Sequence, residues 1–244
     1  MIECVELYKS FGQQQVLRGV SLSMPTGQVT VVIGRSGEGK SVFLKHLIGL
    51  YRPDSGQILI DGRDFAAARG DEKRALKDQF AIVFQSGALF DSLNVFDNVA
   101  FPLRYKSDLA EAEIKDLVEE MLASVGLEEA GSNFLAEISG GMAKRVALAR
   151  ALVLHPRIIL FDEPLTALDP VGKRTIIELI AASHERHGFT AVIVSHNIPE
   201  IFDLADHVAM LSRGRIVAFG RPEEISASKD REVRFFLNGG REDQ

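Results

Sequence analysis

Three short segments are apolar at consecutive positions and rich in β-branched residues: Val29–Ile33, 158–161 and 191–194. Uninterrupted apolar runs of this length are typical of strands that are buried on both faces of a parallel sheet. Each run is followed at once by residues that can carry chemistry, namely Gly34, Asp162 with Glu163, and Ser195 with His196. Because ligands of open α/β sheets bind outside the carboxyl ends of the strands, we expect the three segments to meet at one site.

Other segments follow different periods. Residues 107–125 carry apolar side chains at helical spacing and are followed by Gly126, which predicts an amphipathic helix that ends there. Alternating segments around residues 58–62 and 208–218 predict antiparallel hairpins beside the main sheet. Without an internal repeat or a Pro/Ser-rich linker, the chain reads as one α/β unit with a helical insertion from about residue 93 to 149.

Composition narrows the class of protein. Of 244 residues, 46% are hydrophobic and 25% are charged, and the mean hydropathy is +0.06, as in ordinary globular proteins. No apolar run approaches the roughly 18 to 20 residues that span a bilayer, and the acidic N-terminus lacks the features of a secretory signal, so we expect a cytoplasmic protein. The net charge of −6, without long basic blocks, disfavours nucleic acid as a partner.

The strongest motif follows the first apolar run. Eight consecutive residues match the P-loop pattern G-x-x-x-x-G-K-[ST]: Gly34, Arg35, Ser36, Gly37, Glu38, Gly39, Lys40 and Ser41. Glycines let backbone N–H groups turn toward a phosphate, and the following helix adds the positive end of its dipole. Lys40 is expected to reach the β- and γ-phosphates and Ser41 to hold Mg²⁺, so the motif predicts binding of a nucleoside triphosphate.

Two carboxylates, Asp162 and Glu163, end the second apolar run. Adjacent acids at a buried strand end are costly unless a cation and a polarised water use them. We expect Asp162 to bind Mg²⁺, usually through a water, and Glu163 to orient or deprotonate the attacking water. The pair alone is a weak signal, but together with the P-loop it predicts hydrolysis.

A second glycine-rich segment, Ser139-Gly140-Gly141, opens another helical pattern. A serine and two glycines at a helix start can bind an anion, although they also fit a plain N-cap. If the segment does bind an anion, either the chain binds two nucleotides or a second copy of the chain supplies the second cradle.

These motifs together resemble the ATPase subunits of ATP-binding cassette (ABC) transporters, from Cys4 to about Glu224. Residues 34–41 match the Walker A motif, Ser139-Gly140-Gly141 the signature, and Asp162-Glu163 the Walker B motif. Further matches are Gln85 for the Q-loop, Leu168-Asp169 for the D-loop and His196 for the switch histidine.

The resemblance implies a P-loop ATPase domain over residues 1–224, with a mostly parallel core sheet, an antiparallel β subdomain and a helical subdomain, followed by a tail over 225–244. It implies ATP and Mg²⁺ as ligands, with Ser41, Gln85 and Asp162 at the metal. Glu163 would then prepare the water, His196 would hold the γ-phosphate, and Gln85 would link the site to the permease. Two copies would pack head to tail, so that the signature and Asp169 of one complete the site of the other.

The sequence departs from the family pattern in two places. Met142 stands where the signature usually has Gln, while the serine hydroxyl and the backbone donors remain. The aromatic residue that stacks on adenine is expected to be Phe11, with Tyr8 as the alternative and Val16 packing nearby.

Residues 84–104, together with the signature, are similar to ATPases of the Mla type and to the related toluene-tolerance ATPases. That similarity implies phospholipid transport between the inner and outer membranes. It also implies location on the cytoplasmic face of the inner membrane, bound to a permease, with MCE-domain and STAS-domain proteins as possible further subunits. Another cargo is the main alternative. A DNA-repair or translation ATPase is excluded by the chain length and by the spacing between Lys40 and Ser139, and Glu163 and His196 disfavour a regulator that does not hydrolyse ATP.

The tail contains a short apolar stripe, formed by Val233, Phe236 and Leu237 at helical spacing. A helix this short is not stable alone, so the stripe must dock. It can dock on its own core or on a neighbouring subunit, and both interpretations stay open at this point.

Overall fold

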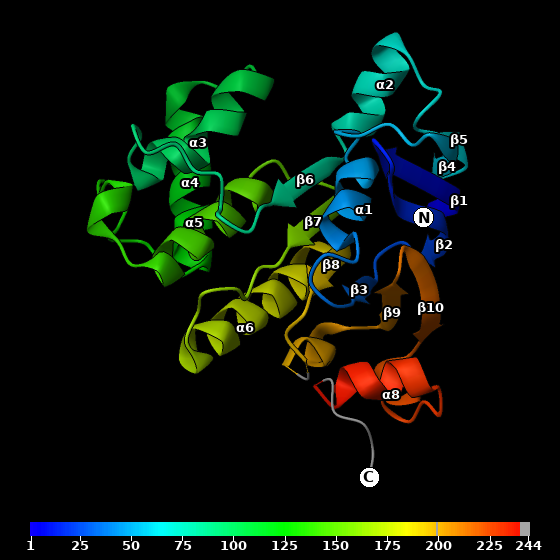
Figure 1. Ribbon diagram of the computed structural model, residues 1–244. Helices are drawn as coiled ribbons and strands as arrows, with labels where there is room; N and C mark the ends of the chain where they lie inside the picture. The colour runs from blue at the N-terminus through cyan, green and yellow to red at the C-terminus, as the bar shows by residue number, and fades with distance from the viewer. Residues whose placement is uncertain (199, 240–244) are drawn as a thin grey trace.

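The computed structural model describes residues 1–198 and 200–239, which form two sheets with helices around them (Figure 1). The larger sheet has the strand order β10-β9-β3-β8-β7-β6. Its strands are β3 (Val29–Ile33), β6 (Phe80–Val83), β7 (Ile158–Asp162), β8 (Thr190–Ser195), β9 (His207–Ser212) and β10 (Arg215–Gly220). All neighbouring pairs are parallel except β9 with β10, which confirms the predicted mostly parallel core sheet.

The three apolar runs form β3, β7 and β8, which are adjacent in this sheet and buried along their whole length. Their residues alternate between two hydrophobic cores on opposite faces of the sheet. In β3, Val31 and Ile33 belong to one core and Val32 to the other. Burial on both faces explains why these strands are apolar at consecutive positions.

The smaller sheet is antiparallel, with the order β2-β1-β4-β5, and it covers one face of the core sheet. It consists of β1 (Ile2–Phe11), β2 (Gln14–Met24), β4 (Ser55–Ile60) and β5 (Arg63–Asp64). Pairing of β4 with β5 confirms the hairpin predicted around residues 58–62. The second predicted hairpin forms from β9 and β10, but these strands belong to the core sheet and do not lie beside it, because β9 pairs with β3. Cys4 is buried in β1.

The helices are distributed over both faces and around the edges of the core sheet. They are α1 (Lys40–Leu47), α2 (Gly70–Lys77), α3 (Val95–Lys106), α4 (Glu111–Ser124), α5 (Gly140–Leu152), α6 (Pro170–His187), α7 (Pro222–Ser226) and α8 (Arg231–Leu237), with 3-10 turns η1 (Leu135–Glu137) and η2 (Glu200–Leu204). In Figure 1, α3, α4 and α5 gather on the side of the molecule away from the antiparallel sheet, as the predicted helical region. Among the described residues, no helix is both long and apolar enough to cross a membrane.

The helix predicted over residues 107–125 is α4, and it begins at Glu111 rather than near Ser107. The side chain of Glu113 accepts a hydrogen bond from the Ala110 N–H at 2.8 Å, which caps the helix start, whereas Ser107 ends α3. A helix start depends on which local cap forms, and the apolar period alone does not determine that.

The tail docks on its own chain through α8. Val233 is completely buried, and Phe236 and Leu237 pack against the core on the same face as α3 to α6. The apolar stripe is therefore covered by the chain that carries it. The predicted division at residue 224 stays a prediction, and it falls inside α7; the last part of the predicted tail, residues 240–244, lies outside the described residues.

Candidate functional site

The P-loop connects the end of β3 to the start of α1. A side chain at Gly34 would not fit, because its Cβ would lie 2.3 Å from the backbone oxygen of Leu211. Gly37 and Gly39 have φ of +84° and +100°, which favours glycine. α1 then begins at Lys40 without a side-chain cap, so the N–H groups of its first turn are presented to an anion.

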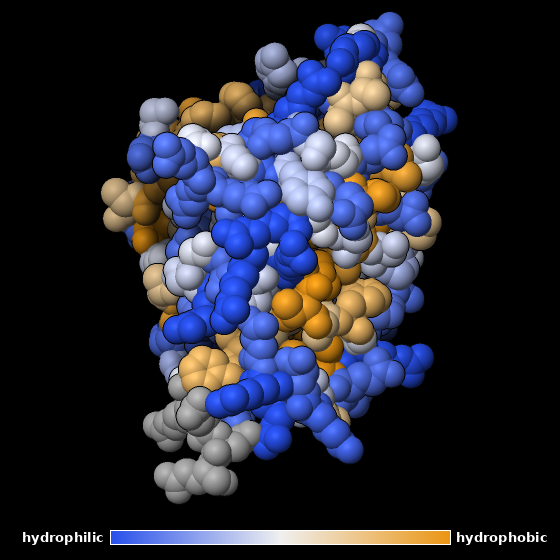
Figure 2. Space-filling view, turned by 45° about the vertical axis from the view of Figure 1, so that its right-hand side comes forward, coloured by the Kyte–Doolittle hydropathy of each residue, from blue (hydrophilic) through white to orange (hydrophobic). Residues whose placement is uncertain are grey.

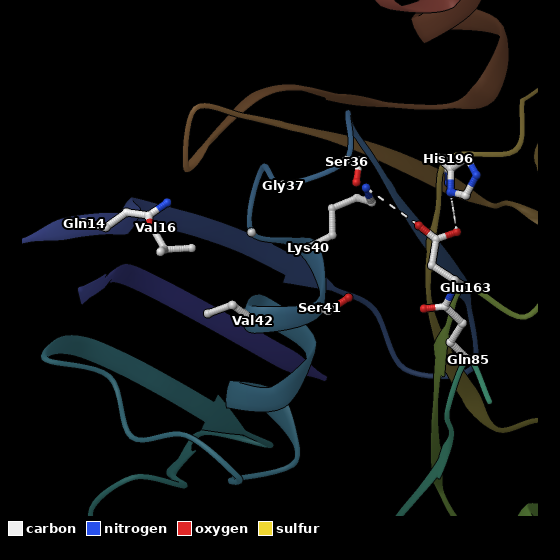
Figure 3. Close-up of a pocket in the computed structure, with 11 residues that line it drawn as sticks. Gln14, Val16, Ser36, Gly37, Lys40, Ser41, Val42, Gln85, Glu163 and His196 are labelled. Carbon is white, nitrogen blue, oxygen red and sulfur yellow. Dashed lines mark hydrogen bonds and ion pairs between the residues drawn. The ribbon is translucent and has the colours of Figure 1, made fainter. Parts of the chain in front are cut away.

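A cavity of about 540 Å³ opens in front of this loop (Figure 3). Its size is within the usual range for small-molecule sites. Gln14 and Val16 lie at one end and Gln85, Glu163 and His196 at the other. Its lining residues are Gln14, Val16, Ser36, Gly37, Gly39, Lys40, Ser41, Val42, Gln85, Glu163 and His196. The shape provides a polar, charged end for phosphates and a less polar end for a base.

Lys40 is held over the cavity by the P-loop itself. Its ammonium group donates to the backbone oxygens of Gly34 at 2.8 Å and Arg35 at 3.1 Å, and lies 3.7 Å from Glu163 Oε1. Burial lowers the pKa of Lys40, while the nearby carboxylates of Glu163 and Asp162 act in the opposite direction. The result is a buried cation directed at the position where phosphates would bind.

Ser41 and Asp162 bring two oxygen atoms together. The Ser41 hydroxyl donates to Asp162 Oδ1 at 2.8 Å, although 121 residues separate them in the sequence. A hydroxyl beside a carboxylate suits Mg²⁺, which usually takes one or two protein oxygens and completes its shell with water and phosphate oxygens. No group of three or more His, Cys, Asp or Glu side chains able to hold a metal occurs within residues 1–198 and 200–239.

Glu163 lies at the centre of the charged end. It follows β7 with φ of +52°, and its N–H donates to the Val194 oxygen of β8 at 2.9 Å. Its Oε2 is 2.8 Å from His196 Nδ1, and the His196 backbone N–H donates to the same oxygen at 3.3 Å. The Glu163 side chain is 10% exposed, so it can meet a water inside the cavity while Lys40 and His196 fix its orientation.

Gln85 reaches the cavity from the end of β6. Its backbone oxygen accepts a hydrogen bond from the ammonium group of Lys144 on α5. Burial lowers the pKa of Lys144, and the Glu163 carboxylate acts in the opposite direction. Lys144, which stands three residues after Gly141, was not predicted from the sequence, and it connects the signature helix to the Q-loop segment within one chain.

The predicted binding residues of the signature and the D-loop are not among the lining residues of this cavity in the described part of the chain; they are Ser139, Gly140, Gly141 and Asp169. The Ser139 hydroxyl accepts from the Met142 N–H at 3.2 Å and caps α5, as the N-cap interpretation predicts. The Asp169 carboxylate accepts from the Gly172 N–H at 2.6 Å and caps α6. Their predicted contacts with nucleotide require a second copy and stay a prediction.

Three further predicted residues have other neighbours. Phe11 packs edge-on against Tyr51, with ring centroids 5.3 Å apart, whereas Val16 does line the cavity. Glu38 accepts a hydrogen bond from the Arg213 backbone, and Arg35 lies against a tail residue. Stacking of Phe11 on adenine stays a prediction. Gln14 and Val42 line the cavity and were missed, because no motif marks the first residue of β2 or the position after Ser41.

A P-loop at the end of β3, together with two carboxylates at the end of β7 in the same parallel sheet, defines a P-loop nucleoside triphosphatase. The sequence profile of the family described as "ABC transporter" matches residues 17–166. The chain belongs to the ABC transporter family, as an ATP-hydrolysing subunit.

The relatives that the chain matches differ in their named cargo. It is 48% identical to the probable ribonucleotide transport ATP-binding protein Mkl of Mycobacterium tuberculosis, over 98% of this chain and 67% of that protein. It is 40% identical to the intermembrane phospholipid transport ATP-binding protein MlaF of Escherichia coli, over 93% of this chain and 85% of that protein. A solved dimer of an ATP-binding cassette with ADP and phosphate superposes with a TM-score of 0.82 at 29% identity, covering 91% of this chain and 99% of that one.

Proposed function

We propose that this chain powers phospholipid transport between the inner and outer membranes, as a homodimer bound to permease subunits at the cytoplasmic face of the inner membrane. The observation that carries the ATPase part is the single cavity in which Lys40, Ser41 and Glu163 meet. The choice of cargo is supported by the similarity to MlaF, which extends over most of both chains. MCE-domain and STAS-domain subunits are the further partners that this cargo suggests.

In the proposed reaction, each residue at the charged end has one task. Lys40 holds the β- and γ-phosphates, and His196 contacts the γ-phosphate while keeping Glu163 oriented. Glu163 accepts a proton from the attacking water as a general base. Ser41 and Asp162, with Gln85 beside them, would hold Mg²⁺, which offsets the negative charge of the phosphates when it is bound.

The proposed dimer follows from where the signature lies. Ser139 and Gly141 start α5 outside the cavity of their own chain, although they present the hydroxyl and N–H groups of an anion cradle. A head-to-tail partner would bring these groups to the γ-phosphate. The dimeric relative bound to ADP and phosphate supports this arrangement.

A groove beside α3 is the proposed contact for the permease. It has a volume of about 280 Å³, and its lining includes Phe90, Phe101, Pro102 and Leu154. The rings of Phe90 and Phe101 are 4.7 Å apart, and both are more than two-fifths exposed, at 41% and 42%. Exposed aromatic rings that contact one another are typical of surfaces that are covered by a partner. The face shown in Figure 2 is mainly hydrophilic, with one apolar patch below and to the right of its centre and further apolar side chains along its left edge.

One buried side chain joins α3 to the segment that lines this groove. Asn98 of α3 is completely buried, and its amide donates to the backbone oxygens of Phe90, Leu93 and Asn94 at 3.0 to 3.2 Å. Its Oδ1 accepts from the Phe90 N–H at 2.8 Å. The segment that leads from Gln85 toward the groove is thereby fixed to α3, so a displacement of Gln85 by nucleotide would reach the surface that contacts the permease.

Ribonucleotide is the second candidate cargo, because the relatives named for ribonucleotide transport are more identical to this chain than the phospholipid-transport relatives are. To test the cargo, the ATPase is purified in complex with its permease, and the complex is reconstituted in proteoliposomes. ATP-dependent transfer of fluorescent phospholipid, absent with Glu163→Gln, is the expected result. ATP-dependent movement of labelled ribonucleotide without phospholipid transfer would replace the proposed cargo.

A further inference from the structure

The tail helix α8 contacts the P-loop directly. The Arg35 guanidinium lies 5.8 Å from the centre of the Phe235 ring, within range of a cation–π interaction. The two residues are 200 positions apart in the sequence. Figure 1 shows α8 beside β9 and β10, next to the end of the core sheet from which the P-loop emerges.

A second set of contacts runs through the turn between β9 and β10. Glu232 of α8 accepts a hydrogen bond from the Ser212 hydroxyl at 2.5 Å and lies 4.0 Å from the Arg213 guanidinium. The backbone N–H of Arg213 in turn donates to the Glu38 carboxylate of the P-loop. The turn packs closely against β2: a Cβ at Gly214 would lie 2.3 Å from the Val16 oxygen, and the Arg18 N–H donates to the Gly214 oxygen at 2.8 Å.

Both sets of contacts lead to Arg35, whose backbone oxygen helps to position Lys40. The backbone oxygen of Arg35 accepts hydrogen bonds from the Lys40 ammonium at 3.1 Å and from the Glu38 N–H at 3.3 Å. Holding the Arg35 and Glu38 side chains from outside therefore restricts the carbonyl that Lys40 uses. A cavity of about 350 Å³ remains between α8 and the loop, so side-chain contacts rather than continuous packing connect the two.

The contacts of α8 divide between two sets of residues. Val233, Phe236 and Leu237 pack on the hydrophobic core and hold the helix in place. Phe235 and Glu232 are partly exposed and contact the P-loop and the β9–β10 turn. Anchoring of the helix and contact with the P-loop can therefore be changed separately.

We propose that Phe235 and Glu232 are positioning residues of the ATP site, which act from the C-terminal helix through Arg35 and Glu38 to hold the P-loop ready for nucleotide. A loop that is ordered before binding loses less conformational entropy on binding. The inference rests on the proposed ATP-binding function and adds an element of the tail to that site.

The test measures the Kd of the full chain for ATP together with its melting temperature. Phe235→Leu should weaken ATP binding by about two- to fivefold, which corresponds to a cation–π contribution of about 0.5 to 1 kcal/mol. Phe235→Tyr keeps the ring face and should retain the affinity of the parent. Phe219→Leu is the matched control, since Phe219 is a partly exposed aromatic of β10 that stacks on His207, and it should leave the Kd unchanged.

A double-mutant cycle then separates positioning from a general effect on the fold. In an Arg35→Leu background, adding Phe235→Leu should cause no further weakening, because the contact is already lost. The proposal is overturned if Phe235→Leu binds ATP like the parent, or if its effect multiplies with that of Arg35→Leu. If Phe235→Leu does not fold, Glu232→Gln takes its place, with unchanged affinity as the refuting result. A parent chain that does not bind ATP would instead refute the proposed function.

Discussion

Replacing Glu163 with glutamine tests the chemistry of the site most directly. The amide keeps the size of the side chain and can still bond to His196, whose Nδ1 lies 2.8 Å from Glu163 Oε2. It has no charge to interact with Lys40, 3.7 Å away, and it cannot take a proton from water. General-base catalysis typically contributes about 10² to 10⁴-fold in rate, or about 2.7 to 5.4 kcal/mol of barrier. We therefore expect turnover to fall by that factor.

The assay is steady-state ATP hydrolysis by the purified transporter complex, with ATP binding measured separately. Glu163→Gln should bind ATP within a few-fold of the parent, whereas Lys40→Ala should lose binding itself. Glu200→Gln is the matched control, because Glu200 pairs with Lys173 on the surface at 3.5 Å and should leave turnover unchanged. Near-normal hydrolysis by Glu163→Gln would refute the assignment of the general base.

Three other predictions follow from the structure. In analytical ultracentrifugation, Glu163→Gln protein should be monomeric without nucleotide and dimeric with ATP and Mg²⁺, and adding Ser139→Ala should weaken that dimer. An oligomeric state that does not depend on ATP would contradict a site completed by the partner. Val233→Ala should lower the free energy of unfolding in urea by about 1.5 to 3 kcal/mol, because this tail residue is fully buried in its own chain. An unchanged midpoint of urea unfolding would mean that the tail docks elsewhere. Burial lowers the pKa of His46 below that of the unfolded chain, so the unfolded state takes up the proton first as the pH falls. Stability should therefore decrease from about pH 7.5 to about pH 5.5, and less steeply in His46→Gln, whereas parallel pH profiles would show that other groups cause the decrease.

The parts of the molecule that the sequence predicts well are those with a local physical signal. Burial of β3, β7 and β8 on both sheet faces makes them apolar at consecutive positions, which identifies them as strands of a parallel sheet. Because the strands pair in parallel, their carboxyl ends lie together. The P-loop is predictable for a similar reason, since the backbone turns at Gly37 and Gly39, with φ of +84° and +100°, favour glycine within the motif itself. In these cases a few neighbouring residues contain the whole constraint.

Contacts between distant side chains have no such signal. The spacing that predicts Phe11 as the adenine-stacking residue does not specify the direction of its ring, which packs against Tyr51. Whether the tail stripe docks in cis depends on the surface that receives Val233, and nothing in residues 225–237 describes that surface. The contact between Arg35 and Phe235 likewise joins a motif to a segment whose position only the folded chain determines.

The left-handed backbone at Glu163, with φ of +52°, has a consequence for protein engineering. For a residue with a Cβ, this backbone conformation lowers the free energy of unfolding by about 1 to 2 kcal/mol. Glycine avoids this strain, and asparagine reduces it. A redesign that ranks substitutions by backbone preference would therefore select against glutamate at this position. The stabilised variant that results would still fold and bind nucleotide in its cavity, but it would lack the carboxylate that faces the water.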